Sequence, residues 1–350
     1  MPSRLNSFAK SVLSRTRKQS KLRQSIRFES LEPRFMMTVS SQFNNGVLDI
    51  HFDANKDEAV VEVAGNQLKV TAGGNATSFV LADIRSIDVN SLFGDEQSIS
   101  FGGILTIPQS FGIHGIQNVT LATGNYHVGS ATIVSPGAIA FTSFTLDSAG
   151  NIVLTASKAL TSTESGVLGF LGVVSKADTA IRINNSSLTG AQIDILARTD
   201  LSANADGDSS EDVNRDFARI KTIGNATIDV LGASNIQSRG SLSILADSLQ
   251  RINATAIASQ TGSTTSRDAA LALTNASSTA TVVLADQSRI GAVGNATIDA
   301  HNTVSVLTKA DGTLALANGK GGIVALADFV GVTTVVVGDS VSIEIGRAHV

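Results

Sequence analysis

The sequence predicts an all-β protein whose body is a right-handed parallel β-helix, or β-solenoid. Runs of alternating apolar and polar residues, such as Val47–Phe52 and Val60–Val63, follow one another from Val39 onward, separated by Gly, Asn, Asp and Ser. Period-2 alternation bounded by turn residues is typical of β-strands. The chain has 31 glycines, four prolines, no tryptophan and one tyrosine, which suits small side chains stacked from coil to coil. A β-sandwich array is the alternative fold.

A repeat in the second half supports the solenoid. Similar strands recur, and their last apolar residues are Ile183, Val230, Leu284 and Val337, at spacings of 47, 54 and 53 residues. A period near 50 with several strands predicts more than one coil per repeat. The expected downstream partners are Leu188, Ile236 and Ile290, followed by a strand that contains Ile193/Ile195, Leu242/Ile244 and Val304/Val306. The extra segment 294–300 is interpreted as a loop insertion.

Composition excludes several classes of protein. There is no cysteine, so disulfide scaffolds, Cys-type zinc sites and thiol catalysis are ruled out. No apolar run reaches the ~18 residues of a transmembrane helix. Residues 1–34 hold nine basic and two acidic residues, net +7, whereas the remainder holds 17 basic and 28 acidic residues, net −11. A basic arm on an acidic body argues against nucleic-acid binding.

The arm, residues 1–38, is expected to be disordered or helical, and its basic residues suit a solvated tail or a targeting segment. It leads into the run FESLEPRFMM. This run resembles the LEPR-XLL domain, a short N-terminal motif of large, repetitive bacterial proteins that are expected at the cell surface. The residues of the motif are Phe28, Glu29, Leu31, Glu32, Pro33, Arg34, Phe35, Met36 and Met37, with the two methionines in place of leucines. The resemblance implies export. A turn at Pro33 before the first strand is the alternative interpretation.

Phenylalanine divides the body. Eleven of the fourteen phenylalanines lie in residues 1–144. We therefore expect residues 39–160 to form a first solenoid section or cap, and residues 161–343 to form Ala/Thr-rich repeats. The Ala/Thr-rich pattern, with its GNAT turns, is similar in composition to filamentous-haemagglutinin-type adhesin repeats. The last residues, 344–350 (EIGRAHV), break the repeat and match a translated sequencing adapter, so we expect the natural protein to continue beyond Ile343.

No catalytic motif is recognisable among the five histidines or the glycine-rich strings. His51 lies two residues from Asp49 and from Asp53, so the three share one face of a strand, which suits a solvated face better than a metal site. Ser91–Ile99 faintly resembles a calcium-binding nonapeptide repeat.

The densest carboxylate cluster lies between residues 206 and 216. Its weak calcium candidates are Asp206, Asp208, Asp212, Asn214 and Asp216. Three of them follow the 1, 3, 5 spacing of an EF-hand, but Phe217 stands at the glycine position, so a solvated loop or a looser calcium site is expected. In a β-helix polysaccharide lyase or hydrolase, Asp212, Arg215 and Asp216 would be the candidate active-site residues.

These observations favour the N-terminal part of a large, exported, non-catalytic β-solenoid of the cell surface or extracellular space, adhesin-like or structural. Its expected partners are matrix, cell-surface or polysaccharide ligands, together with an export machinery that reads the N-terminal motif. No resident cofactor is expected apart from the weak calcium candidates. Two alternatives stay open: a carbohydrate-active β-helix enzyme and a calcium-stabilised secreted structural protein.

Overall fold

The computed structural model describes residues 39–53, 56–91, 96–166, 171–208, 215–257, 269–311 and 322–346. Within them, 21 strands and one 3-10 turn, η1 (Leu81–Asp83), build a single β-structure. From β6 onward every pairing between strands is parallel. The body is therefore a parallel β-solenoid, and the sandwich alternative is wrong. The basic arm and its LEPR-XLL-like motif lie outside the described residues.

The first strands close one end of the solenoid with antiparallel pairs. They are β1 (Val39–Asn44), β2 (Val47–Phe52), β3 (Glu58–Ala64), β4 (Gln67–Ala72) and β5 (Asn75–Val80), and the parallel strand β6 (Ser86–Ser91) follows them. β1 pairs with β2, and β3, β4 and β5 form a meander. Asn45 and Gly46 join β1 to β2 with φ of +52° and +85°, the left-handed conformations of a tight hairpin turn. β2 and β3 then pair in parallel with β6 and β7, which connects this end to the coils.

Three narrow coils follow: β7 (Ser98–His114), β8 (Asn118–Ser135) and β9 (Ala138–Ser148). Ser98 pairs with Asn118 and Asn118 with Ala138, so the chain returns to the same column every 20 residues. The interior is aromatic: the ring of Tyr126 lies 5.6 Å from that of Phe111 and 4.9 Å from that of Phe144. The composition suggested small side chains stacked from coil to coil, and the aromatic interior of the narrow coils departs from that expectation. Gly124 has no side chain to obstruct Phe144, and the Tyr126 hydroxyl donates to the Gly102 carbonyl at 3.4 Å.

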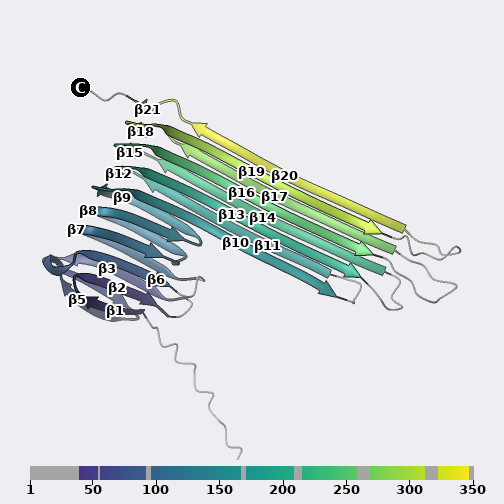
Figure 1. Cartoon of the computed structure of the whole chain (residues 1–350), viewed down its shortest axis with the longest axis horizontal. Helices are drawn as coiled ribbons and strands as arrows, with labels where there is room; N and C mark the ends of the chain where they lie inside the picture. The colour runs from purple at the N-terminus through teal and green to yellow at the C-terminus, as the bar shows by residue number, and fades with distance from the viewer. Residues whose placement is uncertain are drawn as a thin grey trace, which may run out of the picture. The chain divides into compact units, whose positions relative to one another are not determined.

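Beyond Ser148 the coils widen, and each consists of two long strands and one short strand (Figure 1). Four such coils are present in the described residues. They are β10 (Ile152–Gly166), β11 (Leu171–Asn184) and β12 (Ser187–Gly190); β13 (Ile193–Asp208), β14 (Arg215–Leu231) and β15 (Asn235–Ser238); β16 (Leu242–Ile257), β17 (Ala269–Leu284) and β18 (Arg289–Ala292); β19 (Ala296–Asp311), β20 (Gly322–Val337) and β21 (Ser342–Ile345). The two long strands of a coil run out and back as two facing layers, so the wide coils form a two-layered blade.

The register confirms the predicted repeat. Ile183 pairs with Val230, Val230 with Leu284, and Leu284 with Val337. Leu188, Ile236 and Ile290 likewise occupy one column. All these side chains except Val337 are buried, because inward residues stack on their equivalents in the next coil.

Three details of the repeat prediction are wrong. Each repeat is one wide coil rather than several. Leu242 and Ile244 pair with Ala296 and Ile298, whereas Val304 and Val306 pair with Gln250 and Ile252, eight residues further along the same strand. Residues 296–300 of the segment are therefore the start of β19, so the segment is not a loop insertion.

A buried polar seam divides the interior of the wide coils. On one side lies the main core, continuous with the narrow coils, and on the other lies a smaller core built largely of alanine, including Ala203, Ala205, Ala254 and Ala272. Between them the buried Thr199, Ser248, Thr222, Gln250 and Ser278 form hydrogen bonds across and along the coils. Buried and outward-facing residues keep alternating through the seam, so each long strand stays in register. Along the strand, the buried residues change from apolar to polar and back to apolar.

Candidate ligand groove on the short-strand face

The predicted carboxylate cluster falls only partly within the described residues. Asp212 and Asn214 lie outside them. Asp206 is exposed on β13, whereas Asp216, in β14, is buried, so these two carboxylates do not share a face. Asp208 and Arg215 are the last residue of β13 and the first of β14. The described part of the chain contains no group of three His, Cys, Asp or Glu side chains able to hold a metal ion, and calcium binding by this segment stays a prediction.

The histidine of β2 lies as the alternation predicts. His51 is exposed between Asp49 and Asp53, while its neighbours Ile50 and Phe52 are buried. The three polar residues therefore share the outer face of the strand.

A column of polar residues that the sequence analysis missed runs along the outside of the third, short side of the solenoid. Thr106 pairs with His127, His127 with Asp147, Asp147 with Thr189, and Thr189 with Gln237. We call these five residues the polar ladder. Each lies on a successive coil, about 4.8 Å from the next. Their immediate neighbours in each strand, such as Tyr126, Leu146 and Leu188, are buried, which fixes the outward direction of the ladder.

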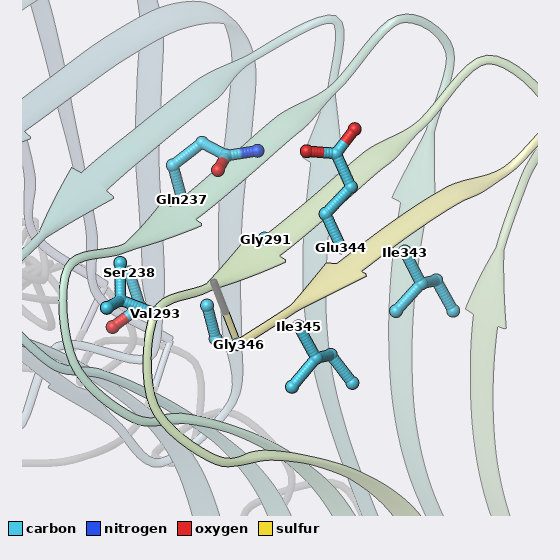
Figure 2. A pocket seen from close by; sticks show the side chains of 9 residues that line it. Gln237, Ser238, Gly291, Val293, Ile343, Glu344, Ile345 and Gly346 are labelled. Carbon is cyan, nitrogen blue, oxygen red and sulfur yellow. The ribbon is translucent and has the colours of Figure 1, made fainter. Parts of the chain in front are cut away.

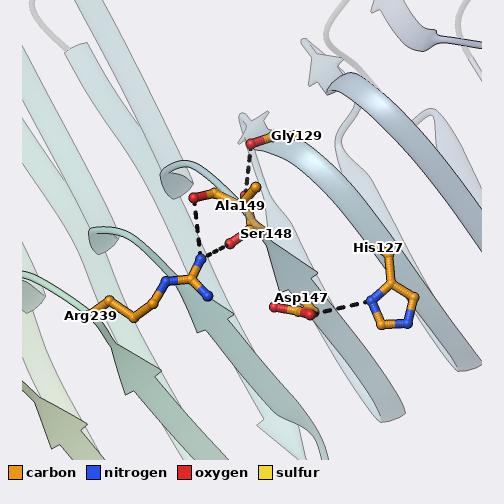
Figure 3. Close-up of polar contacts among 6 residues, drawn as sticks. All are labelled: His127, Gly129, Asp147, Ser148, Ala149 and Arg239. Carbon is orange, nitrogen blue, oxygen red and sulfur yellow. Dashed lines mark hydrogen bonds and ion pairs between the residues drawn. The ribbon is translucent and has the colours of Figure 1, made fainter.

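A shallow groove of about 320 Å³ lies over the first part of the ladder, where the coils change from narrow to wide. Thr106, Pro108, His127, Asp147 and Arg239 are among its lining residues. The imidazole Nδ1 of His127 lies 3.3 Å from the Asp147 carboxylate, and both side chains are about half exposed (Figure 3). The pair is solvated, so its contribution to stability is small.

Arg239, at the edge of this groove, forms hydrogen bonds to the two coils below its own. Its Nη2 donates to the carbonyl of Ser148 and, at 3.2 Å, to that of Ala149, two coils below. Its backbone N–H bonds to the Gly190 carbonyl at 2.8 Å, on the coil between. Among the described residues, the Arg239 guanidinium bonds to the backbone carbonyls of Ser148 and Ala149 and forms no ion pair with a carboxylate, and its positive charge lies at the groove.

A second hollow, of about 450 Å³, lies further along the same face (Figure 2). Gly291 continues the column above Gln237, and it has no side chain to fill its place. The Gln237 amide occupies part of that space, since a Cβ on Gly291 would overlap Oε1 of Gln237. Nε2 of Gln237 donates to Oδ1 of Asn235 at 2.9 Å, and Gln237 is partly exposed.

The groove carries the chemistry of a binding surface. Arg239 supplies donors, Asp147 supplies acceptors, and His127 and Thr106 can supply either. Alternating donors and acceptors at this spacing suit the hydroxyl groups of a sugar. The signal that could have revealed the ladder is the spacing of 21 residues from Thr106 to His127 and 20 from His127 to Asp147, a shorter period than the one that the second half suggested.

No family model, no curated protein and no solved structure matches the chain. Within the described residues, no helix has both the length and the apolar character needed to cross a membrane.

Proposed function

We propose that the chain is part of an exported, non-catalytic surface protein that acts as an adhesin-like β-solenoid, binding polysaccharide through the groove beside the polar ladder. The observation that carries the proposal is the groove itself, where Arg239, Asp147 and His127 from three different coils converge on one outer surface. The resemblance of Phe28–Met37 to the LEPR-XLL motif supports export.

The architecture suits a stiff, display-type scaffold. Each coil is bonded to its neighbours through parallel strands, so stability is roughly a sum of nearest-neighbour contacts, and coils can be added without rearranging the others. The outer faces carry exposed ion pairs between coils, such as Arg182 with Asp229 at 3.3 Å and Arg251 with Asp200 at 2.9 Å. Such pairs favour solubility and register more than stability.

The binding proposal is tested with the full chain on a panel of immobilised neutral and acidic polysaccharides. We expect Asp147→Asn and Arg239→Ala each to weaken binding at least about tenfold, the loss of one good charged hydrogen bond. Arg198→Ala is the matched control, because Arg198 is also a surface arginine, with Asp247 3.5 Å away, but lies outside the groove. Equal affinity of all three variants and the unaltered chain would refute the groove as the binding surface.

The non-catalytic part of the proposal is tested in the same incubations. New reducing ends or unsaturated sugar products, formed by the purified chain and absent without it, would show a lyase or hydrolase and overturn that part. Export is tested by adding protease to intact cells that produce the chain. We expect loss of the full-length band without lysis, and protection until the cells are opened would contradict a surface location.

A further inference from the structure

A short motif that neither the fold nor the groove explains recurs along the chain. The sequence Asn-x-Ser/Thr, with a residue other than proline in the middle, occurs eight times, at Asn75, Asn118, Asn184, Asn185, Asn225, Asn253, Asn275 and Asn295. In exported proteins this motif is the acceptor of N-linked sugars, and the attachment site lies on the surface. The motif of Asn184 is unsuitable, because its hydroxyl belongs to Ser186, which is buried. The other seven motifs are candidate acceptors.

The β-solenoid places both groups of the motif on the same outer face of a strand. Residues i and i+2 of a strand point to the same side. In β8, Asn118 and Thr120 therefore face outward together, and Val119 between them is buried. Recognition of an acceptor requires the hydroxyl as well as the amide, so the folded strand already presents both groups to a glycosyltransferase.

Four of the seven asparagines lie at strand starts or in turns and have an accessible amide. Asn75 and Asn118 are the first residues of β5 and β8, Asn185 lies in the turn from β11 to β12, and Asn295 directly precedes β19. All four are exposed. Oδ1 of Asn185 accepts a hydrogen bond from the backbone N–H of Ala233 at 3.1 Å, which orients the side chain and leaves its Nδ2 without a partner in the described part of the chain. The side-chain amides of the other three form no hydrogen bond to any described residue.

The residues beside these four amides are small. They are Ala72 for Asn75, Ser98 and Ala138 for Asn118, Gly232 for Asn185, and Ser241 for Asn295. At Asn185 the small neighbour is required, because a Cβ on Gly232 would overlap the side-chain oxygen of Asn185. A bulky group attached to any of the four amides would therefore extend into solvent without displacing a neighbouring side chain.

The three motifs in the middle of long strands differ from these four. Nδ2 of Asn225, in β14, donates to Oδ1 of Asp178 at 2.8 Å. Nδ2 of Asn275, in β17, donates to Oδ2 of Asp328 at 3.4 Å. Because a carboxylate already lies against each of these nitrogens, the two amides are less accessible to an incoming sugar. Asn253, in β16, is only partly exposed.

We propose that Asn75, Asn118, Asn185 and Asn295 are sites of N-glycosylation. The donor is a sugar joined through its anomeric carbon to the phosphate of a nucleotide or lipid carrier. Nδ2 of the asparagine forms a bond to that carbon, and the carbon–oxygen bond to the phosphate breaks. The phosphorylated carrier leaves with the electron pair, and Nδ2 loses one proton. The proposal is independent of the groove, because none of the four asparagines lines it.

The test is peptide mapping by mass spectrometry of the full chain, recovered from the cells that produce it. We expect the mass of one or more sugars on each of the four asparagines and none on Asn225 or Asn275. Thr120→Ala removes the hydroxyl of the motif and should abolish the sugar on Asn118, whereas Thr120→Ser keeps the motif and should keep the sugar. Thr227→Ala is the matched control, because Thr227 is also a partly exposed threonine two residues after a motif asparagine, and it should leave the sugar content unchanged.

Three results would overturn the proposal. The first is a chain without sugar mass on any of the four asparagines. The second is a sugar on Asn118 that persists in Thr120→Ala. The third is equal occupancy of Asn225 or Asn275, because neither exposure nor a free amide would then select the acceptor. The same preparation is used for the polysaccharide panel and the protease assay, so a failure of binding or of export is measured separately from an absence of sugars.

Discussion

Removal of one hydrogen bond from the polar seam should reveal energetic coupling across the two layers of the blade. Thr222 donates to Oε1 of Gln250 at 2.9 Å, and Nε2 of Gln250 donates to the Ser277 carbonyl at 2.7 Å. Both side chains are completely buried. Gln250 stacks between Leu201 and Val304, so leucine at position 250 would continue an apolar column.

The magnitudes follow from these contacts. Gln250→Leu loses two hydrogen bonds and leaves the Thr222 hydroxyl unpaired, which we expect to lower the free energy of unfolding by about 2 kcal/mol after the gain in apolar burial. Thr222→Val leaves the Gln250 oxygen unpaired and should cost about 1–2 kcal/mol. The double variant removes both partners at once, so it should cost about 2 kcal/mol, less than the sum of the single changes.

The assay is urea unfolding of the four proteins in this double-mutant cycle, followed by far-ultraviolet circular dichroism. A coupling energy of about 1–2 kcal/mol is expected, well above the ~0.3–0.5 kcal/mol scatter of independent sites. Additive effects within that scatter would refute the inference that the seam joins the two layers through this bond. Ile244→Val, a substitution in the main core, calibrates the measurement at about 1 kcal/mol.

Two further predictions concern the narrow coils. Burial raises the pKa of the Tyr126 phenol, so the folded state holds this proton where the unfolded state has lost it. The contribution of Tyr126 to stability is therefore complete below the ordinary tyrosine pKa of about 10 and falls as the pH rises above it. Because Tyr126 is the single tyrosine, tyrosinate absorbance should appear only when the protein unfolds. Tyr126→Phe should remove this loss of stability at alkaline pH. A Cβ on Gly129 would overlap the main-chain oxygen of Gln109, whereas one on Gly172 would meet nothing within 4 Å. Gly129→Ala should thus lower the thermal midpoint by several degrees and Gly172→Ala hardly at all, and equal midpoints would contradict the close packing of these coils.

Much of the fold was predictable because stacked residues of a solenoid resemble one another. The column from Ile183 to Val337 could be aligned from the sequence, since each member is apolar and β-branched or leucine and follows a similar strand. The error at Val304 and Val306 has a physical cause. Up to Val306, the inward-facing residues of β19 are apolar except for Asn302, which stacks on Ser248 of the coil below. This polar residue makes one long strand resemble two short strands in the sequence. On sequence alone, the second half of β19, with Val304 and Val306, therefore aligns with the start of β16.

The ladder could not be predicted in the same way. Its members, among them Thr106, His127 and Asp147, differ in chemistry, and only the 20-residue period of the narrow coils relates them. Arg239 reaches Ser148 across two coils, a contact that depends on three-dimensional stacking rather than on sequence spacing.

The change in coil size also determines how the chain would respond to tension. Pulling on the two ends of a solenoid peels it one coil at a time, and each event releases the length of chain that the coil contained. A narrow coil, with its 20-residue period, would release about 70 Å, and a wide coil, with a period of 41 to 54 residues, about 140–190 Å. A single-molecule stretching trace should therefore show two classes of step, short for the aromatic section and long for the blade. The wide coils would then act as the larger reserve of extensible length.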